Sequence, residues 1–286
     1  MRRAAAALAR RAAATARGSP ARAPTAARAL ATAAPPAADA AELAKFRSYD
    51  WWDPSGPAAP LHALNPARVG FVREEVLRSA AVRGVAPPSP DEPPLARLRL
   101  LDVGCGGGIL AEALARLGAA VTGIDAGEEG PAAGAAHAAH DPPLAARLDY
   151  RAGIAEAEAA SHPGQYDAVV ASEVIEHVPD PAAFVAALAR AAAPGGAVIL
   201  STLARTPRSW AVAIAGAEYV ARLLPPGTHD WGRFINPEEL AALGDGAGLD
   251  LARLAGMAPV GQRARWVLTD DPSVNYIAAF VKRDEG

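Results

Sequence analysis

The sequence is poor in cysteine and in long apolar runs, and each shortage excludes one kind of structure. Cys105 is the only cysteine in 286 residues, which excludes an internal disulfide framework and indicates a reducing compartment. No run of 18 apolar residues is free of charge, so no membrane-spanning helix is predicted. The formal net charge of −3 gives no indication of nucleic-acid binding. Hydrophobic residues make up 51% of the chain, enough for one sizeable core and a tail, or for two small domains.

The first forty residues differ in composition from the rest of the chain. Arginines are scattered among alanines there, and no acidic residue precedes Asp39. This pattern is typical of an organelle transit peptide and favours the mitochondrion; the alternative is a disordered tail with a biased composition. Pro35 and Pro36 would end any helix in the segment. We therefore predict a transit peptide or disordered segment over 1–41 and a folded domain over 42–286.

From residue 99 onwards, short apolar strands alternate with helical patterns. A helix is expected from about Pro66 to Ala80, and a proline-rich loop over 84–94. This alternation predicts one α/β domain with a mainly parallel, seven-stranded sheet and helices on both faces. The seven expected strands lie at about 100–103, 120–125, 150–152, 167–171, 197–202, 249–254 and 275–282.

A glycine-rich loop follows the first of these strands. Residues 101–108 read Leu-Asp-Val-Gly-Cys-Gly-Gly-Gly, and an open α/β sheet binds its ligand where such a strand ends. Asp125 closes the next strand, where an acid can accept hydrogen bonds from both ribose hydroxyls of an adenosine. The sequence therefore predicts a nucleoside-containing ligand on this loop.

The spacing of the glycines separates two classes of ligand. Gly104, Gly106 and Gly107 form G-x-G-G, whereas a dinucleotide site has G-x-G-x-x-G with its pyrophosphate at the helix N-terminus. Asp102 stands just before the loop, where a carboxylate suits a cationic ligand better than a pyrophosphate. The stretch resembles motif I of the class I S-adenosylmethionine-dependent methyltransferases, a Rossmann-like fold. Asp125 matches the acid of that fold's second strand.

Carboxylates and a histidine follow the strand at 167–171. If 173–177 forms a helical turn, Glu173, Glu176 and His177 share one face near the carboxyl edge of the sheet. Three interpretations remain open: a site for a divalent cation that activates a hydroxyl, His177 as a general base oriented by the glutamates, or residues that only cap the loop.

Blocks outside the cofactor motif narrow the resemblance further. They are similar, in order from about 46 to 282, to the ubiquinone-biosynthesis O-methyltransferases. That family methylates polyprenylated catechol-type intermediates, and its eukaryotic members lie at the matrix face of the inner mitochondrial membrane. The blocks that carry the resemblance are 46–53, 64–71, 201–206, 216–219, 226–231, 234–240 and 274–276.

The resemblance implies a role for several residues. Arg68, Gly104 and, through the loop, Gly106 and Asp102 would hold S-adenosylmethionine, with Asp125 on the ribose and Ser172 near the adenine. Glu173, Glu176 and His177 would bind Mg²⁺ or another divalent cation, and His177 and Glu176 would be catalytic. The resemblance also implies contact with the inner membrane and with a ubiquinone-biosynthesis protein complex. The stretch 127–143 departs from the expected clean helix, because glycines and prolines interrupt it.

Residues 203–232 form a long insertion between two strands of the sheet. Its mostly apolar helix, flanked by arginines, is predicted to be a substrate lid or a surface that docks on the bilayer where a polyisoprenoid substrate lies. Three alternatives to the main functional interpretation remain. They are methylation of another small phenolic acceptor, a nicotinamide oxidoreductase, and a non-catalytic subunit that binds S-adenosylmethionine.

Overall fold

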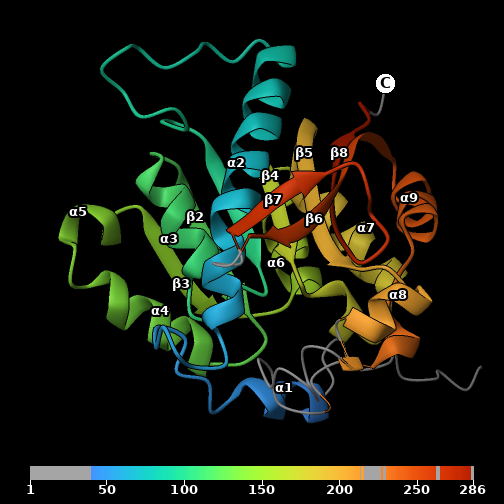
Figure 1. The fold of residues 1–286 in the computed structure, drawn as a ribbon. Coiled ribbons are helices and arrows are strands. Elements are labelled where there is room, and N and C mark those ends of the chain that lie inside the picture. The colour runs from blue at the N-terminus through green and yellow to red at the C-terminus, as the bar shows by residue number, and fades with distance from the viewer. Residues whose placement is uncertain (1–39, 213, 216–226, 228–229, 262–264, 285–286) are drawn as a thin grey trace, which may run out of the picture. The chain divides into compact units, whose positions relative to one another are not determined.

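The computed structural model describes residues 40–212, 214–215, 227, 230–261 and 265–284 (Figure 1). The prediction for 1–41 lies outside the described residues except at its last two positions. Most of the predicted apolar helix in the 203–232 insertion lies outside them as well. No helix in the described part of the chain is long and apolar enough to cross a membrane.

One mixed sheet of eight strands forms the centre of the domain, in the order β3-β2-β1-β4-β5-β8-β6-β7. The first five are parallel to one another, and β8 runs antiparallel to both β5 and β6. The strands are β1 (Arg99–Val103), β2 (Ala120–Asp125), β3 (Leu148–Ala152), β4 (Tyr166–Ser172), β5 (Ala192–Leu203), β6 (Leu249–Val260), β7 (Arg265–Thr269) and β8 (Asn275–Lys282).

The α/β class and the seven predicted strands are confirmed, but the sheet has one strand more. The additional strand is β7, which pairs antiparallel with β6 as the second arm of a hairpin at the sheet edge. Its five residues are half-buried or exposed, so its sequence lacks the buried apolar run that marks the central strands.

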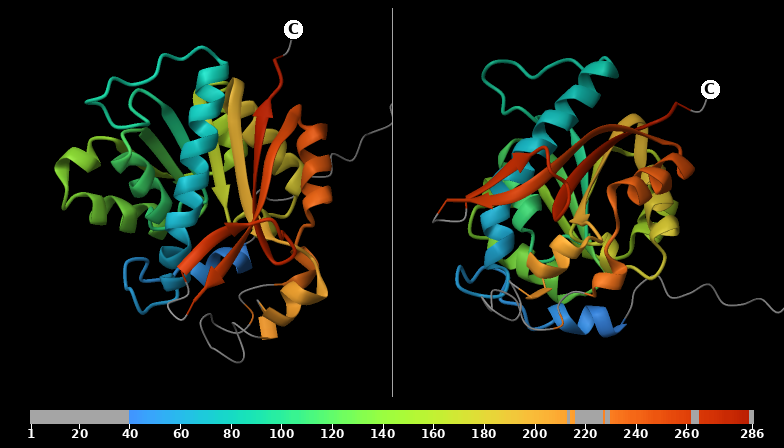
Figure 2. Two further views of the ribbon diagram at one scale, coloured as in Figure 1. Left: turned by 45° about the horizontal axis from the view of Figure 1, so that its top comes forward. Right: turned by 45° about the vertical axis from the view of Figure 1, so that its right-hand side comes forward.

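Helices cover both faces of the sheet (Figure 2). On one face, α2 and α3 pack on strands β1, β2, β4 and β5, and on the other face α6, α7 and α9 pack together. The helices and single turns are α1 (Ala40–Phe46), α2 (Ala59–Val82), α3 (Ile109–Arg116), α4 (Glu129–Ala138), α5 (Pro142–Ala145), α6 (Ala155–Ser161), η1 (Ile175–His177), α7 (Pro181–Ala191), α8 (Pro207–Ser209), η3 (Trp231–Arg233) and α9 (Pro237–Gly246).

Strand β1 shows how the sheet positions the site. Leu101 and Val103 point into the core beneath α7, whereas Leu100 points into the opposite core beneath α2 and α3. Because side chains alternate along a strand, Asp102 points to the same side as Leu100. The acid therefore lies at the carboxyl end of the sheet on the side covered by α2.

Helix α2 begins earlier than predicted. Pro66 was the expected start, but the helix starts at Ala59 with Pro60 in its first turn, and Pro66 lies inside it. Proline is favoured in the first turn because its missing N–H has no intrahelical partner there. Pro60, six residues before Pro66, takes that position.

Candidate active site

The loop after β1 has a backbone that requires glycine. Gly104, Gly106 and Gly108 have φ angles of +71°, +50° and +84°. The N–H groups of Gly104 and Cys105 both donate to the Ile124 carbonyl oxygen, at 2.8 and 3.0 Å. These bonds hold the loop against the end of β2, in a conformation that L side chains rarely adopt.

Asp125 lies beside this loop, as the sequence predicts. Its two carboxylate oxygens accept hydrogen bonds from the N–H groups of Gly106 and Gly127, at 3.0 and 2.9 Å. Burial raises the pKa of Asp125, and the two backbone donors oppose that rise. The carboxylate therefore braces the glycine loop, and its remaining acceptor capacity faces the cavity that it lines.

Asp102 and Arg68 meet beneath the loop. Asp102 is 2% exposed, and its Oδ2 has no hydrogen-bond partner among the residues that the structure describes. Burial raises its pKa to about 7, against the lowering effect of the nearby Arg68 guanidinium. Arg68 is also buried and donates to Asn65 Oδ1 at 2.8 Å and to Ser172 Oγ at 3.1 Å. A buried carboxylate without a partner costs free energy, and a cationic group of a ligand would offset that cost. The unpartnered Asp102 oxygen at the cavity wall therefore fits a cationic ligand group.

Ser172 and Glu173 stand at the end of β4 in a polar network. The Ser172 and Ser201 hydroxyl oxygens are 2.8 Å apart, and Ser201 Oγ donates to Glu173 Oε1 at 2.7 Å. Asn275, at the start of β8, donates to Glu173 Oε2 at 3.2 Å. Glu173 has a φ of +59°, so the chain turns sharply there. Sequence reasoning missed Asn275, because only the pairing of β8 with β5 brings it to this edge.

The expectation that Glu173, Glu176 and His177 share one face of a helical turn is wrong. Helical geometry is limited to the 3₁₀ turn η1, because the positive φ of Glu173 breaks the turn before it can begin. Glu176 is 3% exposed, accepts a hydrogen bond from Thr202 Oγ1 at 2.9 Å, and lines a second hollow. Burial and the nearby Glu173 charge raise the pKa of Glu176 to about 8.

His177 instead faces the main cavity. Its Nδ1 lies 2.8 Å from Glu42 Oε2, and the ring packs edge-on against Phe46, with centroids 5.3 Å apart. Both partners belong to α1, of which Phe46 is the last residue. Nothing in the sequence linked this helix to residue 177. The cluster of aromatic residues at 46–52, within the block 46–53 that carries the family resemblance, is the sequence signal that marks this segment.

The residues as placed do not fit a metal ion. Among residues 40–284, outside the gaps in the description, no group of three or more His, Cys, Asp and Glu side chains is close enough to hold one. Glu173 is bound to Ser201 and Asn275, and His177 to Glu42, so the predicted cation ligands each have another partner.

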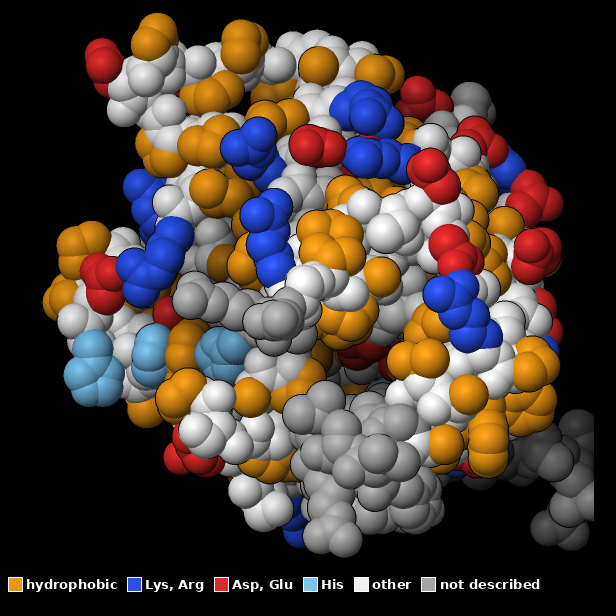
Figure 3. Space-filling model, viewed as in Figure 1, with side chains coloured by type: hydrophobic (Ala, Val, Ile, Leu, Met, Phe, Trp, Pro, Cys, Tyr) orange, Lys and Arg blue, Asp and Glu red, His pale blue; other side chains and the backbone are white. Residues whose placement is uncertain are grey.

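A cavity of about 690 Å³ connects the glycine loop with His177. Asp102, Gly104 and Asp125 line the part of the cavity beside β1 and β2, and Glu42 and His177 line the part beside α1 and η1; these two parts are called its ends. Much of the wall between the two ends is apolar. Figure 3 shows a hollow on this face of the molecule, where hydrophobic side chains gather around acidic side chains at greater depth. The volume is in the range of sites for small molecules and cofactors.

Comparison with known proteins agrees with this geometry. A family model described as "Methyltransferase domain" matches residues 32–254. The crystal structure of magnesium protoporphyrin IX methyltransferase from Synechocystis, with bound SAH, has a TM-score of 0.50 and 21% identity, covering 74% of this chain and 82% of that chain. At that identity the likeness concerns the fold alone. The fold, the glycine loop and the family model together define an S-adenosylmethionine-dependent methyltransferase.

Closer relatives specify the family. The mitochondrial ubiquinone biosynthesis O-methyltransferase of Arabidopsis thaliana is 42% identical over 85% of this chain and 74% of its own length. The ubiquinone biosynthesis O-methyltransferase of Dinoroseobacter shibae is 45% identical over 85% of this chain and 96% of its own. That of Thiobacillus denitrificans is 44% identical over 84% and 96%. The chain belongs to this family of ubiquinone biosynthesis O-methyltransferases.

Proposed function

We propose that the chain transfers a methyl group from S-adenosylmethionine to a hydroxyl of polyprenylated catechol-type intermediates of ubiquinone. The observation that carries the proposal is the single cavity with a carboxylate-lined glycine loop at one end and His177 at the other. A cofactor and an acceptor held at those two ends would meet in one enclosed, mostly apolar space.

The cofactor end supplies acceptors for a positively charged ligand. Asp102, with its unpartnered oxygen, is assigned to the ammonium group of the cofactor's methionine part, and Asp125 to the ribose hydroxyls. Arg68, Gly104, Gly106 and Ser172, which line the cavity or support its wall, are assigned to the same ligand, with Ser172 near the adenine. Calorimetry with S-adenosylmethionine tests the assignment, and binding of a nicotinamide dinucleotide instead would contradict it.

His177 is assigned as the general base. Its Nε2 would take the proton of the acceptor hydroxyl while Glu42, beside Nδ1, favours the charged imidazolium that forms. The hydroxyl oxygen then attacks the methyl carbon, a new C–O bond forms, and the C–S electron pair stays on the sulfur of the thioether product. Glu176 lines the neighbouring hollow, so its carboxyl group would not touch the acceptor and would affect the reaction only through the residues around it.

A turnover assay distinguishes this function from its alternatives. Labelled methyl transfer to a short-chain polyprenyl catechol would support the proposal, and transfer to other small phenols would measure its selectivity. Binding of the cofactor with no transfer to any phenol would instead favour a non-catalytic subunit.

Contact with the membrane is part of the proposal because the acceptor is lipid-soluble. Trp210 and Val212, at the start of the 203–232 insertion, are each 51% exposed, and Val212 also lines the cavity. An exposed apolar element at a cavity wall suits a surface that admits a lipid tail. Sedimentation with liposomes of inner-membrane composition tests the contact, and Trp210→Ser with Val212→Ser should weaken it. Unchanged sedimentation would favour a substrate lid over a membrane-docking surface as the role of this insertion.

We also propose a location at the matrix face of the inner mitochondrial membrane, within a ubiquinone-biosynthesis complex. The arginine-rich, acid-free start of the chain supports import, and the Arabidopsis relative is named mitochondrial. Fusion of residues 1–41 to a fluorescent reporter tests the import, and affinity purification from mitochondria tests the complex.

The divalent cation implied by family resemblance stays a prediction. It would require Glu173, Glu176 and His177 to leave their present partners and converge. Calorimetric titration with MgCl₂, in the presence and absence of S-adenosylmethionine, tests it, and activity that survives strict chelation would contradict it.

A further inference from the structure

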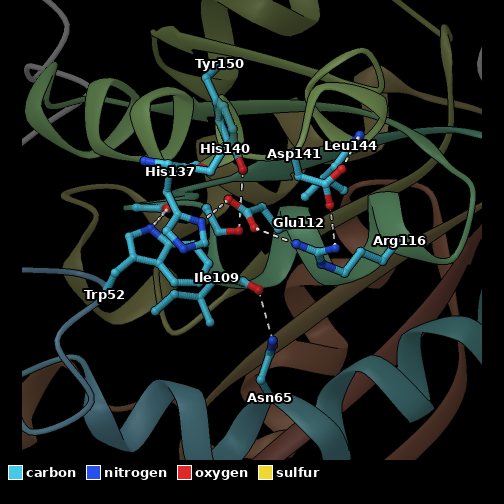
Figure 4. A network of polar contacts seen from close by, with 12 residues as sticks. Trp52, Asn65, Ile109, Glu112, Arg116, His137, His140, Asp141, Leu144 and Tyr150 are labelled. Atoms are coloured by element: carbon cyan, nitrogen blue, oxygen red, sulfur yellow. Dashed lines mark hydrogen bonds and ion pairs between the residues drawn. The ribbon is translucent and has the colours of Figure 1, made fainter.

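Two adjacent tryptophans contact the glycine loop. Trp52 donates from Nε1 to the Gly107 carbonyl oxygen at 3.0 Å. Its ring stacks on His137 with centroids 3.4 Å apart and planes 3° apart, beside the first turn of α3 (Figure 4). His137 in turn lies 2.8 Å from the buried Glu112 carboxylate. This stack fixes the segment before α2 to the cofactor loop.

Trp51 packs on the same loop and lines the main cavity. A Cβ added to Gly106 would lie 2.5, 2.5 and 3.0 Å from three adjacent ring atoms of Trp51. Nearly equal distances to three ring atoms mean that Gly106 packs against the face of the indole, not its edge. The Trp51 carbonyl oxygen is 2.8 Å from Nε2 of His62 in α2, which holds the residue from a second direction.

The position of the indole relates it to one atom of the cofactor. Gly106, which the ring covers, donates to Asp125, the residue assigned to the ribose. Asp102 is assigned to the methionine part, and the cofactor's sulfur joins the ribose to that part. The sulfur would therefore lie between these two carboxylates, beside the covered loop. Because the cofactor's sulfur carries a positive charge and the product's does not, the indole face that is not packed on Gly106 would favour the cofactor through a cation–π interaction.

We propose that Trp51 is a cofactor-contacting residue that favours the sulfonium of S-adenosylmethionine over the neutral thioether of S-adenosylhomocysteine. The proposal rests on the proposed cofactor site. It gives the aromatic segment before α2 a role in releasing the product, since a ring that binds the charge strongly binds the demethylated product less.

Calorimetric titration of both ligands against three variants of the full chain tests the role. Trp51→Leu removes the π face but stays apolar and bulky, and should weaken S-adenosylmethionine about tenfold with a smaller loss for S-adenosylhomocysteine. Trp51→Phe keeps a π face and should keep most of the preference. Trp52→Phe removes the anchoring hydrogen bond, so it should weaken both ligands equally and leave their ratio unchanged.

The outcomes separate the inference from the assignment on which it depends. If Trp51→Leu weakens both ligands equally, or strengthens either one because the ring had blocked the cavity, the role of Trp51 is overturned. If the unmodified chain binds neither ligand, the cofactor assignment as a whole falls, and this inference with it.

Discussion

The two ends of the cavity are built in different ways. At the cofactor end, the functional groups follow one another along adjacent parallel strands, and Asp102, the glycine loop and Asp125 are fixed mainly by backbone hydrogen bonds. At the acceptor end, His177 pairs with Glu42, 135 positions away, and Glu173 pairs with Asn275, 102 positions away. A site made by strand ends is thus a local property of the sequence. A site made by side-chain pairs between distant segments is not.

The largest expected effect concerns the acceptor end. His177→Gln should lower kcat by roughly 10²–10⁴, the usual contribution of a general base, with little change in cofactor affinity. His162, the residue after α6, has its Nδ1 3.0 Å from Glu158 Oε1 of that helix and does not line the cavity, so His162→Gln is a matched control that should keep normal turnover. Steady-state kinetics and calorimetry measure the two quantities. A His177→Gln variant that loses cofactor affinity instead would show that the two ends do not act separately.

A glycine substitution tests the cofactor end. Gly106→Ala should weaken cofactor binding about 100-fold, because its Cβ would lie 2.5 Å from the Trp51 ring at a positive φ and displace the loop. Gly84 has a φ of +73° with no atom within 4 Å of an added Cβ, so Gly84→Ala has a similar backbone cost but should leave affinity unchanged. Equal loss of affinity in both variants, measured by calorimetry, would contradict the local origin of this end.

Loss of the Asp125 carboxylate, which accepts hydrogen bonds from that loop, should weaken cofactor binding less than Gly106→Ala does. Asp125→Asn should weaken cofactor binding tenfold or more, since charge-assisted hydrogen bonds contribute about 1.5–3 kcal/mol. Asp167 accepts hydrogen bonds from Arg99 N–H at 2.8 Å and Arg83 Nη2 at 2.6 Å, at the opposite end of the sheet. Asp167→Asn should therefore lower the melting temperature without weakening the cofactor. The comparison would fail if both substitutions changed affinity alike.

The remaining comparison is a pH dependence of stability at Glu176, in the hollow beside the acceptor end. Folded Glu176 keeps its proton up to a pKa of about 8, whereas the unfolded chain loses it near 4.5. Its contribution to the free energy of unfolding is complete below pH 4.5 and decreases as the pH rises to about 8. Glu176→Gln, neutral at every pH, should gain about 3.5 kcal/mol relative to the parent between pH 5 and 8, at about 1.4 kcal/mol per pH unit over most of that range. The free energy of unfolding of both proteins is measured by denaturant titration at these pH values. If the difference between Glu176→Gln and the parent does not change with pH, Glu176 is not held protonated.

Much of the fold could be predicted, because the central strands are buried on both faces and read as short apolar runs. Val169, Val198 and Ile199 are of this kind. Strand β7 was missed because it lies at the edge of the sheet and is only half-buried. The glycine loop and Asp125 were placed correctly for the same local reason: each directly follows a recognisable strand.

The sequence marked Glu173, Glu176 and His177 as candidates, but their arrangement could not be predicted from it. The spacing of Glu173, Glu176 and His177 suggests one helical face, and only the φ of +59° at Glu173 breaks it. No sequence pattern indicates that conformation, because it follows from the hydrogen bonds between Glu173 and its neighbours on β5 and β8. The partner of His177 could not be read either, since Glu42 lies in an unrelated helix.

The sequence by itself determined the parallel sheet, the cofactor loop and the acid beside it, because strand burial and glycine conformation act over a few neighbouring residues. Tertiary structure alone decided which groups face one another across the cavity: Glu42 with His177, Asn275 with Glu173, and Trp51 with Gly106. The physical reason is that a side-chain contact depends on the relative positions of whole elements. Those positions are set by packing across the entire core.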